Sequence, residues 1–446
     1  MPPVPRVRLV VLNYNGGDHV LRCVEHLERL QWPEDRLEIV VVDNASVDGS
    51  DRVLEARPRV RLVRSGRNMG FPGNNLALRD LTGVDFVGLV NNDAFADPDY
   101  LRPLVDVLSS DPRLGAACPK ILLAHRFCDL RVEAETWRPP GDDRDLSVRV
   151  SGVRVDGTEQ WRHTLFTEGV YDPERGGSDE PRMRWLAGDA LLRVPVQPRS
   201  PRATVEVRLA TERPTTVKLD GGSDVVEVRV DGGPRWISVP LGGDLYDVVN
   251  NVGSDLVNAS WGGDRGFLEP DIGQFDEPRD VFAWCGAGVL FRPEYLLDVG
   301  LFDERFFMYY EDTDMAWRGR ARGWRYRYVP DALLRHLHAA TSVEGSPLFH
   351  HFVERNRLVM LTKNAPLPLA AGAVARFVLS TGSYARRDVV RPVLHGRRPT
   401  TGLVRARVRS FAAYVRMLPR VLPDRRRLRA GQVVPDEAIT GWSVTR

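Results

Sequence analysis

Three closely spaced carboxylates, Glu311, Asp312 and Asp314, directly follow a run of bulky apolar residues at positions 306–310. Carboxylates are costly to bury, so acids at this spacing after an aromatic segment are rarely accidental. A helix that begins near Thr313 would place Glu311 and Asp312 at its positive N-terminal end, where acidic side chains and anionic ligands are both stabilised. The stretch alone supports two interpretations, a functional site or an ordinary helix cap followed by core packing.

The region from residue 7 to residue 123 alternates between strand-like and helix-like patterns. Continuous apolar runs are typical of strands that are buried on both faces of a parallel sheet, and the segments between them have apolar residues at helical spacing. We expect strands in residues 7–14, 37–44, 59–65 and 85–93, and helices in 18–29, 47–57 and 74–81. This alternation predicts right-handed βαβ crossovers and a doubly wound α/β sheet.

Polar residues follow three of these strands at the point where each strand ends. They are Asn13 and Asn15, then Asp43 and Asn44, then Asn91, Asn92 and Asp93. Ligands bind at the carboxyl edge of open α/β sheets. Asn and Asp also favour turns, so one pair alone would be ordinary turn chemistry, but three groups at one edge predict a nucleotide site.

Charge is distributed unevenly along the chain. Residues 365–446 contain sixteen arginines, no lysine and four acids, a net charge of +12, whereas the whole chain has +2, so residues 1–364 carry −10. Apolar residues recur among these arginines at near-helical spacing in 370–379 and 404–422, which favours amphipathic helices that lie on an anionic membrane surface. Nucleic acid is the rival partner, but no recognisable nucleic-acid-binding module accompanies the arginines, so we expect none to be bound.

The remaining composition is that of an ordinary globular protein, with 43% apolar and 27% charged residues. Four scattered cysteines without CxxC spacing argue against a zinc site or a disulfide framework and favour reduced thiols. No signal-peptide pattern precedes the first strand, and no apolar run reaches the roughly 18 to 20 residues that a membrane-spanning helix needs. We therefore expect a cytoplasmic protein that lies peripherally on the inner face of the plasma membrane.

A set of short segments occurs in a fixed order along the chain. The segments are VVLNYNG, VVDNASVDGS, NMGF, LVNNDA, FFMYYEDTDMAWR, GW and VPDALLRH. This ordered set resembles the inverting family 2 glycosyltransferases of the GT-A fold, especially the bacterial rhamnosyltransferase-like branch. The resemblance covers residues 7–123 and about 265–365, and it implies a doubly wound, Rossmann-like mixed sheet. After GF the family has one more residue before its Asn, so the loop before Asn75 is expected to be reshaped.

The region between residues 130 and 255 has a different pattern. Apolar and polar residues alternate there, and Gly, Pro and Asp turns separate the segments, which predicts an antiparallel β-sandwich or barrel. The domains expected are residues 1–137 for the nucleotide-binding half, 138–252 for an inserted β-sandwich, 253–365 for the acceptor and catalytic half, and 366–446 for the arginine-rich region. Tryptophans of the insert could stack on sugars, but packing within the sandwich is the favoured interpretation.

The resemblance implies a donor site for a nucleotide diphosphate sugar. Asp43 would accept a hydrogen bond from the base ring, Arg265 would pair with phosphate, and Gly286 would leave room for the sugar. Arg355 belongs to a segment that resembles the family's RNR sequence and would orient the donor or close the site. The residues expected at the donor are Asn13, Asn15, Asp43, Asn44, Asn68, Gly70, Asn92, Arg265, Gly286 and Arg355.

The resemblance also implies a metal site. Asp93 stands at the last acid of the family's DXD motif, and Asn91 and Asn92 occupy the two earlier positions. His336 follows the VPDA segment, where the family has a metal-binding histidine. Asp93, His336 and two phosphate oxygens would form a partial shell for Mg²⁺ or Mn²⁺. His338 is expected to support this site or to be a surface histidine.

The catalytic base follows from the family's ED motif. Asp312 would remove the proton of the acceptor hydroxyl in a single displacement. Glu311 would orient the acceptor, or serve as the base if the register is shifted by one residue. Asp314 is expected to cap the helix or to pair with Arg318 at i+4.

The substrate is less well defined than the reaction. Rhamnose from dTDP-rhamnose is the preferred donor, with galactofuranose or another hexose from a UDP-sugar next, and the acceptor is expected to be a cell-envelope glycan or a lipid-linked glycan. A catalytically silent glycan-binding scaffold is the alternative, but the joint presence of Asp93, Asp312 and His336 favours an enzyme. A nucleotidyltransferase would have a Gly- and Lys/Arg-rich sequence after the first strand, and NYNGGD does not fit.

Overall fold

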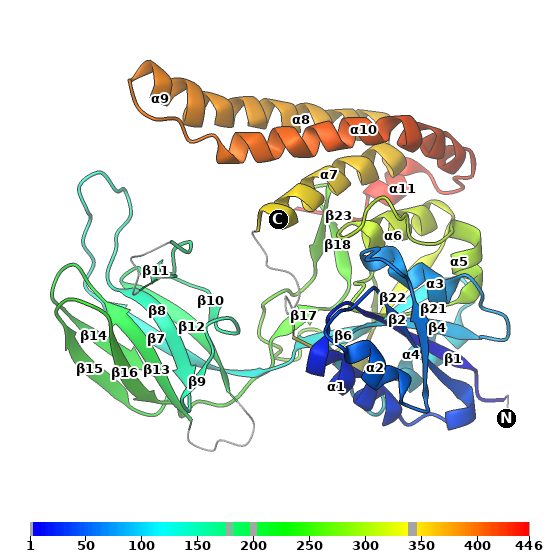
Figure 1. Cartoon of the computed structure of the whole chain (residues 1–446), viewed down its shortest axis with the longest axis horizontal. Coiled ribbons are helices and arrows are strands. Elements are labelled where there is room, and N and C mark those ends of the chain that lie inside the picture. The colour runs from blue at the N-terminus through cyan, green and yellow to red at the C-terminus, as the bar shows by residue number, and fades with distance from the viewer. Residues whose placement is uncertain (1–2, 175–179, 181, 197–202, 338–345, 446) are drawn as a thin grey trace. The chain divides into compact units, whose positions relative to one another are not determined.

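The structure, a computed structural model, describes residues 3–174, 180, 182–196, 203–337 and 346–445. The chain divides into two compact units, whose elements are labelled in Figure 1. Met1–Ala124 and Val249–Arg446 together form the first unit, and His125–Val248 forms the second. The second unit is therefore an insertion within the sequence of the first.

A mixed sheet forms the centre of the first unit. Its strand order is β20-β22-β6-β21-β4-β1-β2-β3, with β5 beside β22 and β17 beside β6. The strands are β1 (Val7–Asn13), β2 (Leu37–Asp43), β3 (Val60–Arg64), β4 (Phe86–Asn91), β5 (Ala94–Ala96), β6 (Leu114–Leu123), β17 (Val249–Asn251), β20 (Arg279–Asp280), β21 (Gly288–Phe291) and β22 (Arg325–His336). β1 is parallel to β2 and β4, whereas β21 is antiparallel to β4 and β6. The predicted mixed α/β sheet is confirmed.

Two hydrophobic cores cover the two faces of this sheet. Leu9 and Val11 of β1 belong to one core, and Val10 between them belongs to the other. Successive side chains of a strand point to opposite faces, so a strand covered on both faces is apolar at every position. This arrangement explains the continuous apolar runs in the sequence.

Helices pack against the sheet and continue into the C-terminal region (Figure 1). They are α1 (Gly17–Glu28), α2 (Ser50–Glu55), α3 (Asn75–Leu78), α4 (Leu101–Ser110), α5 (Pro293–Val299), α6 (Glu311–Ala321), α7 (Pro347–Asn364), α8 (Leu367–Ala385), α9 (Arg391–Leu394), α10 (Gly402–Ala430) and α11 (Asp436–Thr440). A small sheet contains β18 (Ser254–Val257), β19 (Trp261–Asp264) and β23 (Ser443–Val444).

Helix α6 begins at Glu311 and not at Thr313, the start expected from the sequence. The residue before it, Tyr310, has a positive φ of 69°. An L-residue in this left-handed region cannot continue a regular strand or helix, so the chain turns at Tyr310 and the helix starts at the next residue. Glu311 and Asp312 therefore lie inside the first turn, at the positive end of the helix.

The arginine-rich region forms helices that belong to the first unit. Helices α8 and α10 lie side by side, and α9 is at the end of this hairpin (Figure 1). Phe377 of α8 stacks on Phe411 of α10 with ring centroids 5.8 Å apart, and the hydroxyl of Tyr414 lies 2.9 Å from that of Thr362 on α7. Part of the apolar faces of α8 and α10 thus packs against protein, whereas Val378, Leu379, Val408, Val415 and Leu422 are 44–72% exposed, and the contact with a membrane that we expected of these helices remains a prediction. In the described part of the chain, no helix is both long and apolar enough to cross a membrane.

The second unit consists of antiparallel sheets around a shared core. One sheet has the order β10-β12-β7-β14-β15 and the other β11-β8-β13-β16, with β9 beside β8. The strands are β7 (Arg126–Ala134), β8 (Arg149–Val155), β9 (Thr158–Glu159), β10 (Leu165–Phe166), β11 (Arg184–Trp185), β12 (Asp189–Val196), β13 (Thr204–Ala210), β14 (Thr215–Asp220), β15 (Val225–Val230) and β16 (Arg235–Pro240). Val217 and Leu219 of β14 are buried between exposed neighbours, as the alternating pattern predicts.

The boundaries of this unit differ from the expected 138–252. The unit begins at His125 because β7 pairs with β12 and β14 of the same unit. It ends at Val248 because β17 pairs with β6 of the first unit. The sequence alone did not indicate that β7 leaves the central sheet, since its residues follow β6 with a break of two residues.

Candidate active site

The ends of β1 and β2 bring the first expected donor residues together. Asn13 and Asp43 are partners in the parallel register, and both are buried. The Asn13 amide donates to Asp43 Oδ1 over 3.3 Å and to the hydroxyl of Ser50 over 2.9 Å. Asn15 Oδ1 accepts a hydrogen bond from the main-chain N–H of Val47. The carboxyl edge thus holds these polar side chains in a rigid network, as predicted for strand ends that converge.

A second group surrounds Asn44. Its amide nitrogen donates to Asn68 Oδ1 over 3.0 Å and to the carbonyl of Gly70 over 3.1 Å. Gly70 has φ 66° and ψ −159°, a conformation that is essentially restricted to glycine. A Cβ at Gly70 would also collide with the carbonyl of Phe307. Gly70 is therefore required for close contact between this loop and residues 306–310, which we call the aromatic loop.

Gly286 and Arg265 lie in surroundings that the sequence did not predict. A Cβ at Gly286 would lie 2.6 Å from the ring of Phe71, so the space beside Gly286 is filled by this ring. Arg265 donates to the carbonyl of Val252 over 3.1 Å, and its guanidinium lies 4.8 Å from the ring centroid of Phe275. Burial lowers the pKa of Arg265. The expected contacts of Gly286 and Arg265 with a donor remain predictions.

Asp93 and His336 are brought together by the pairing of β5 and β22. Their side chains are buried, and His336 Nε2 lies 3.1 Å from Asp93 Oδ1. His336 Nδ1 lies 2.8 Å from Asn250 Oδ1, an oxygen that can only accept a hydrogen bond, so Nδ1 is the donor of this pair and Nε2 is the nitrogen that faces Asp93. An imidazole nitrogen and a carboxylate oxygen at this distance are joined by a proton, and both groups are also ligands for a divalent cation.

Asp93 is surrounded by further polar groups. Burial raises the pKa of Asp93, but the neighbouring His336 outweighs this effect and holds the pKa below its usual range. Asn92 is also buried, and its amide lies 2.7 Å from the position that a Cβ of Gly16 would take. Gly16 thus allows Asn92 to lie close to the end of β1. His338 lies outside the described residues.

The acids at the start of α6 differ in exposure. Glu311 is 6% exposed and Asp312 is half-buried. Burial and the adjacent Asp312 raise the pKa of Glu311 well above its usual range, which favours a neutral carboxylic acid. Among the described residues, Glu311 Oε2 has no hydrogen-bond partner. Glu311 therefore contributes little negative charge beside Asp312.

Asp312 has the properties of a carboxylate that can accept a proton near neutral pH. Its Oδ1 accepts hydrogen bonds from the main-chain N–H and the hydroxyl of Thr313, over 2.6 and 3.1 Å. Burial, and after it the nearby carboxylate of Asp264, raise the pKa of Asp312 to about 6, while the hydrogen bonds from Thr313 act in the opposite direction. The carboxylate is thus the main form above this pH.

Asp264, whose charge acts on Asp312, lies close to the residues that contact the Asp93–His336 pair. Asn251 donates to Asp264 Oδ1 over 2.5 Å, and the preceding residue, Asn250, is the partner of His336. Neither Asn250 nor Asp264 was among the candidate residues from the sequence. Asp264 directly precedes Arg265 in the DRGF segment, which was noticed only for its arginine. The neighbouring asparagines 250 and 251 at the end of a strand were the available signal for Asn250.

The aromatic loop that precedes α6 has an unusual backbone. Phe307, Tyr309 and Tyr310 have φ values of 65°, 68° and 69°. Asn356 of α7 is fully buried, and its amide nitrogen lies 2.9, 2.8 and 2.8 Å from the carbonyls of Phe306, Met308 and Tyr309. Left-handed residues other than glycine persist only where the surroundings hold them. Asn356 supplies that support directly beside the two acids.

Arg355 also contacts this loop. Its guanidinium donates to the carbonyls of Arg305 and Phe306, and its Nε donates to Asn356 Oδ1 over 2.8 Å. Burial lowers the pKa of Arg355 to about 10. The segment that resembles the RNR sequence therefore supports the aromatic loop, and contact of Arg355 with a donor remains a prediction.

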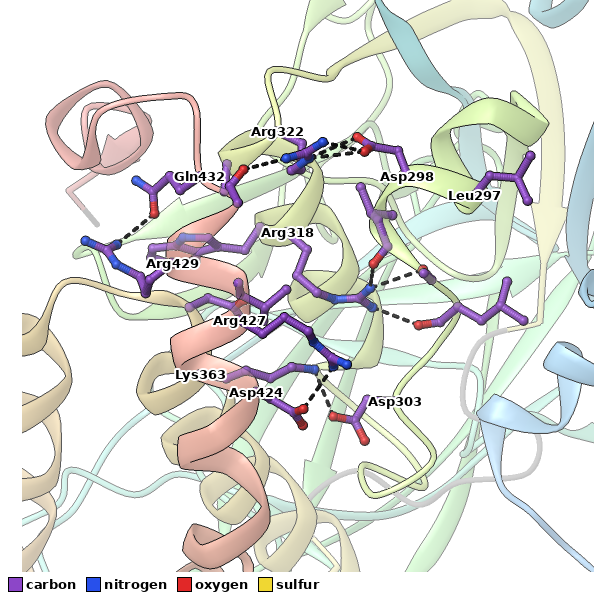
Figure 2. A pocket seen from close by; sticks show the side chains of 18 of the residues that line it. Leu297, Asp298, Asp303, Arg318, Arg322, Lys363, Asp424, Arg427, Arg429 and Gln432 are labelled. Carbon is purple, nitrogen blue, oxygen red and sulfur yellow. Dashed lines mark hydrogen bonds and ion pairs between the residues drawn. The ribbon is translucent and has the colours of Figure 1, made fainter.

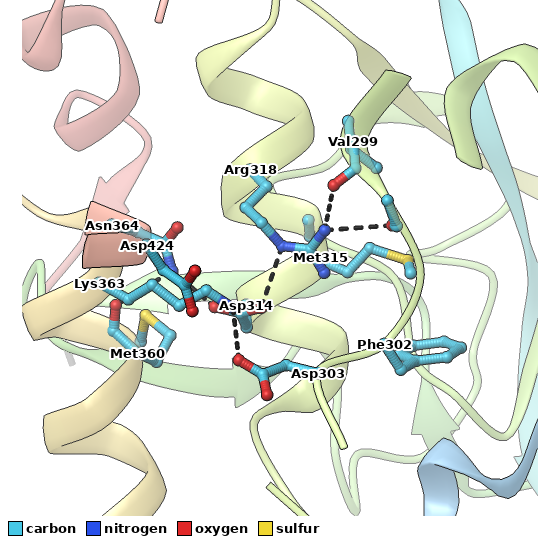
Figure 3. A network of polar contacts seen from close by, with 12 residues as sticks. Val299, Phe302, Asp303, Asp314, Met315, Arg318, Met360, Lys363, Asn364 and Asp424 are labelled. Atoms are coloured by element: carbon cyan, nitrogen blue, oxygen red, sulfur yellow. Dashed lines mark hydrogen bonds and ion pairs between the residues drawn. The ribbon is translucent and has the colours of Figure 1, made fainter. Parts of the chain in front are cut away.

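Asp314 lies in a separate network, which Figure 3 shows. It is 0% exposed, and it pairs with Arg318 over 3.0 Å and with Lys363 over 2.8 Å. The amide of Asn364 donates to its other oxygen over 2.7 Å. The predicted pairing of Asp314 with Arg318 is confirmed. This acid holds α6 against α7 and is not available to a substrate.

A cavity of about 610 Å³ lies towards the other end of α6, between α5, α6 and α10 (Figure 2). Its charged side chains bond to one another. Arg322 pairs with Asp298 over 2.7 Å, and Lys363 pairs with Asp303 over 2.8 Å. None of the expected donor, metal or base residues lines this cavity.

Comparisons with known sequences give consistent results for both parts of the first unit. The model of "Glycosyl transferase family 2" matches residues 9–141, and that of "Glycosyl transferase family group 2" matches residues 258–357. An N-acetylglucosaminyl-diphospho-decaprenol L-rhamnosyltransferase of Mycobacterium tuberculosis is 43% identical over 196 residues, which cover 41% of this chain and 60% of the relative. The succinoglycan biosynthesis protein ExoO of Rhizobium meliloti is 32% identical over 105 residues, 23% of this chain and 30% of the relative. The chain thus matches less than two thirds of these relatives.

Solved structures resemble the chain more distantly. GalNAc-T7 with UDP, GalNAc and Mn²⁺ is 13% identical with a TM-score of 0.43, over 81% of this chain and 48% of that chain. The mannosyltransferase PcManGT from Pyrobaculum calidifontis with GDP-Man and Mn²⁺ is 16% identical with a TM-score of 0.40, over 94% and 88%. These TM-scores are below 0.5, so the family assignment depends on the sequence matches. Since the two family models match residues 9–141 and 258–357 and the mycobacterial relative is 43% identical over 196 residues, the chain belongs to glycosyltransferase family 2.

Proposed function

We propose that this enzyme is an inverting transferase that moves a sugar, preferably rhamnose from dTDP-rhamnose, to a cell-envelope or lipid-linked glycan. The observation that carries the proposal is the setting of Asp312. This half-buried acid has a pKa raised to about 6, in part by the charge of Asp264, which accepts a hydrogen bond from Asn251, and the adjacent Asn250 contacts His336 of the Asp93–His336 pair. A base and a pair of metal-ligand groups are what glycosyl transfer from a diphosphate requires.

Asp312 is the proposed base. Its carboxylate takes the proton of the acceptor hydroxyl while the hydroxyl oxygen forms a bond to the anomeric carbon of the donor. The bond from that carbon to the diphosphate oxygen breaks in the same step, so the configuration is inverted and the nucleoside diphosphate leaves. Thr313 holds Asp312 Oδ1, and a neutral Glu311 limits repulsion near the developing charges.

The edge of the sheet provides the proposed donor site. Asn13, Asp43 and Asn44 lie in connected networks at the ends of β1 and β2, and Gly16 allows Asn92 to approach them. We assign base and ribose recognition to this edge, as the sequence predicted. Asn15, Asn68, Gly70, Arg265, Gly286 and Arg355 complete the donor set that we propose.

The Asp93–His336 pair fits a divalent cation. His336 Nε2 and a carboxylate oxygen of Asp93 face each other over 3.1 Å, and nitrogen and oxygen ligands of this kind suit Mn²⁺ or Mg²⁺. Within the described residues, no group of three or more His, Cys, Asp or Glu side chains forms a metal cluster, so diphosphate oxygens and water would complete the shell. When bound, the ion stabilises the charge of the leaving diphosphate.

The choice of acceptor is supported by one relative. The mycobacterial protein is named for transfer of L-rhamnose to N-acetylglucosaminyl-diphospho-decaprenol. We infer a similar lipid-linked acceptor here, which would place the enzyme at the cytoplasmic face of a membrane. UDP-galactofuranose or another UDP-hexose is the next donor to test.

The test is a donor panel with purified protein, Mn²⁺ or Mg²⁺ and an N-acetylglucosaminyl-diphospho-lipid acceptor. We expect dTDP-rhamnose to be consumed and the reaction to stop with EDTA. Asp312→Asn should abolish turnover, whereas Glu304→Gln, a change at an exposed acid outside the site, should not. If no donor is consumed, or if Asp312→Asn turns over like wild type, the proposed mechanism is wrong.

Binding should be tested separately from turnover. Thermal shift with dTDP is expected to increase when Mn²⁺ is present, and His336→Ala should remove this increase while retaining the fold. Equal shifts for wild type and His336→Ala would contradict the proposed metal site. A larger shift with UDP than with dTDP would replace the preferred donor with a UDP-sugar.

A further inference from the structure

The hairpin of α8 and α10 ends in a short segment with its own composition. We call residues 386–398 the hairpin tip; it contains a π-helical turn at Arg386–Val390, helix α9 and the residues that follow it. Close to the tip, near the end of α8 and the start of α10, Arg407 donates to Glu354 of α7 over 3.0 Å and to the hydroxyl of Ser380 over 2.8 Å. These contacts connect the hairpin to α7. The tip is the end of the hairpin where the chain turns from α8 to α10, and α9 marks it in Figure 1.

Large apolar side chains of the tip face solvent. Val390 is 48% exposed, Val393 is 56% exposed and Leu394 is 76% exposed. Elsewhere on the hairpin Phe377 and Val421 are buried, but Val378, Leu379, Val408, Val415 and Leu422 are also 44–72% exposed, so the tip is distinguished by its exposed apolar residues together with its arginines. Apolar side chains that are clustered and exposed at the end of a projecting element indicate an interaction surface.

Arginines surround these apolar residues. The tip contains Arg386, Arg387, Arg391, Arg397 and Arg398 and a single acid, Asp388, which pairs with Arg387 over 2.5 Å. The other four arginines form no ion pair within the described residues. The tip therefore has a net charge of +4 and no lysine. Guanidinium groups bind phosphate with two parallel hydrogen bonds, which a lysine cannot do.

We propose that the hairpin tip is a membrane-docking element that inserts its apolar side chains into an anionic lipid bilayer. The arginines bind lipid phosphates while Val390, Val393 and Leu394 enter the boundary between headgroups and acyl chains. This inference goes beyond sugar transfer, because it concerns a surface remote in sequence from the site residues. It also differs from the sequence-based expectation, in which the faces of α8 and α10 lie flat on the membrane.

The combination of side chains favours lipid over other occupants. A nucleic acid would attract the arginines but would gain little from three exposed aliphatic side chains. A second copy of the chain would place two clusters of charge +4 against each other, which opposes association. An anionic bilayer satisfies both the charge and the apolar groups, and basic residues each increase binding to such a surface by about five-fold.

Flotation of the full-length protein with vesicles tests this proposal. We expect wild type to float with vesicles of phosphatidylcholine and phosphatidylglycerol but not with phosphatidylcholine alone. The triple variant Arg391→Gln/Arg397→Gln/Arg398→Gln should lower binding about a hundred-fold. The triple variant Val390→Ser/Val393→Ser/Leu394→Ser should lower it about ten-fold or more, because less apolar surface is removed from water. Transfer to a water-soluble acceptor should be unchanged in both.

Matched controls change the same residue types elsewhere. Arg29→Gln/Arg52→Gln/Arg113→Gln removes as much positive charge from exposed positions, and Val225→Ser/Ile272→Ser/Leu297→Ser removes exposed apolar side chains. Both controls should float like wild type. Equal loss of flotation in a control would overturn the proposal, because any exposed arginine or apolar residue would then suffice.

Other occupants give different outcomes. If the arginine variant loses flotation while the Val/Leu variant keeps it, phosphate attraction alone explains binding and insertion of the tip is excluded. If light scattering finds a dimer for wild type and a monomer for the Val/Leu variant, the tip is a self-association surface and the proposal fails. Flotation requires no glycosyl transfer, so an inactive but floating protein would contradict only the proposed function.

Discussion

Two acids that are two residues apart on α6 have opposite surroundings. Asp312 is half-buried, its pKa is raised to about 6, and it lies near another carboxylate, Asp264. Asp314 is fully buried and is neutralised by Arg318 and Lys363 (Figure 3). One helical turn therefore contains one carboxylate that we propose for chemistry and another that holds α6 against α7. The neighbours of each acid, and not its spacing in the sequence, determine the difference.

The largest expected effect is the loss of activity in Asp312→Asn. Removal of a general base lowers kcat by roughly 10²- to 10⁴-fold, and the amide keeps the shape of the side chain. Stability should be unchanged or higher, because an acid with a raised pKa is destabilising when ionised. Steady-state kinetics and thermal unfolding of the same sample measure the two effects. A large fall in melting temperature would mean that Asp312, like Asp314, is structural.

The reverse result is expected for Asp314→Asn. Lys363 and Arg318 would lose a buried anionic partner, which costs about 3–5 kcal/mol of unfolding free energy. The fraction that remains folded should keep most of its kcat, because Asp314 does not face the site. Chemical denaturation measures the loss, and Lys363→Met in the same background should recover part of it, because Asp303, the other partner of Lys363, keeps its ion pair with Arg305. A loss below about 1 kcal/mol would show that the network in Figure 3 contributes little.

A smaller loss of activity is expected from a change at Asn356, which supports the aromatic loop directly before Glu311 and Asp312. Asn356→Ala removes the donor that lies within 2.9 Å of three carbonyls of the aromatic loop; Phe306 keeps its hydrogen bond from Arg355, but the carbonyls of Met308 and Tyr309 lose this partner, at about 1–3 kcal/mol for each buried group left unpaired. Because Tyr310 lies directly before Glu311, relaxation of the loop should displace Asp312. We expect kcat to fall more than KM rises.

A matched amide in the other network provides the control for Asn356. Asn364→Ala removes the amide that donates to Asp314 over 2.7 Å, and it should lower stability with little change in kcat. Similar kinetics for Asn356→Ala and Asn364→Ala would contradict the positioning role of Asn356. Thermal unfolding shows in each case how much of the change is due to stability.

The sequence predicted the fold where local pattern decides it. Apolar runs such as residues 37–43 predict a strand that is buried on both faces of a sheet. In a parallel sheet, the polar residues that follow such strands lie at the same edge, as Asn13 and Asp43 do. Period-two alternation similarly predicted the antiparallel sheets of the second unit. The start of that unit was missed because β7 has the pattern of any strand, and its partners β12 and β14 are distant in sequence.

The candidate site was likewise predictable only where local sequence spacing determines a contact. The pairing of Asp314 with Arg318 follows from helical spacing. The left-handed conformation of Phe307, Tyr309 and Tyr310 does not, because aromatic residues carry no local preference for positive φ, and tertiary contacts such as those with Asn356 hold them there. Asp264 was missed because it comes near Asp312 only in the folded protein. An interaction between two residues so far apart in the sequence produces no local sequence pattern.

The smallest expected effect is a shift in pH dependence, and it tests why Asp312 differs from Asp314. The active form of Asp312 is the carboxylate, so kcat/KM should fall about ten-fold per pH unit below about 6. The groups that face Asp312 are Glu311, Asp264, Thr313 and the backbone of Gly286. Removal of the negative charge in Asp264→Asn makes ionisation of Asp312 easier, which lowers its pKa and moves the fall in kcat/KM to lower pH. The pH profile of Glu304→Gln should match wild type. A profile of Asp264→Asn that is unchanged, or that moves to higher pH, would show that Asp264 does not tune this acid and that burial alone distinguishes it.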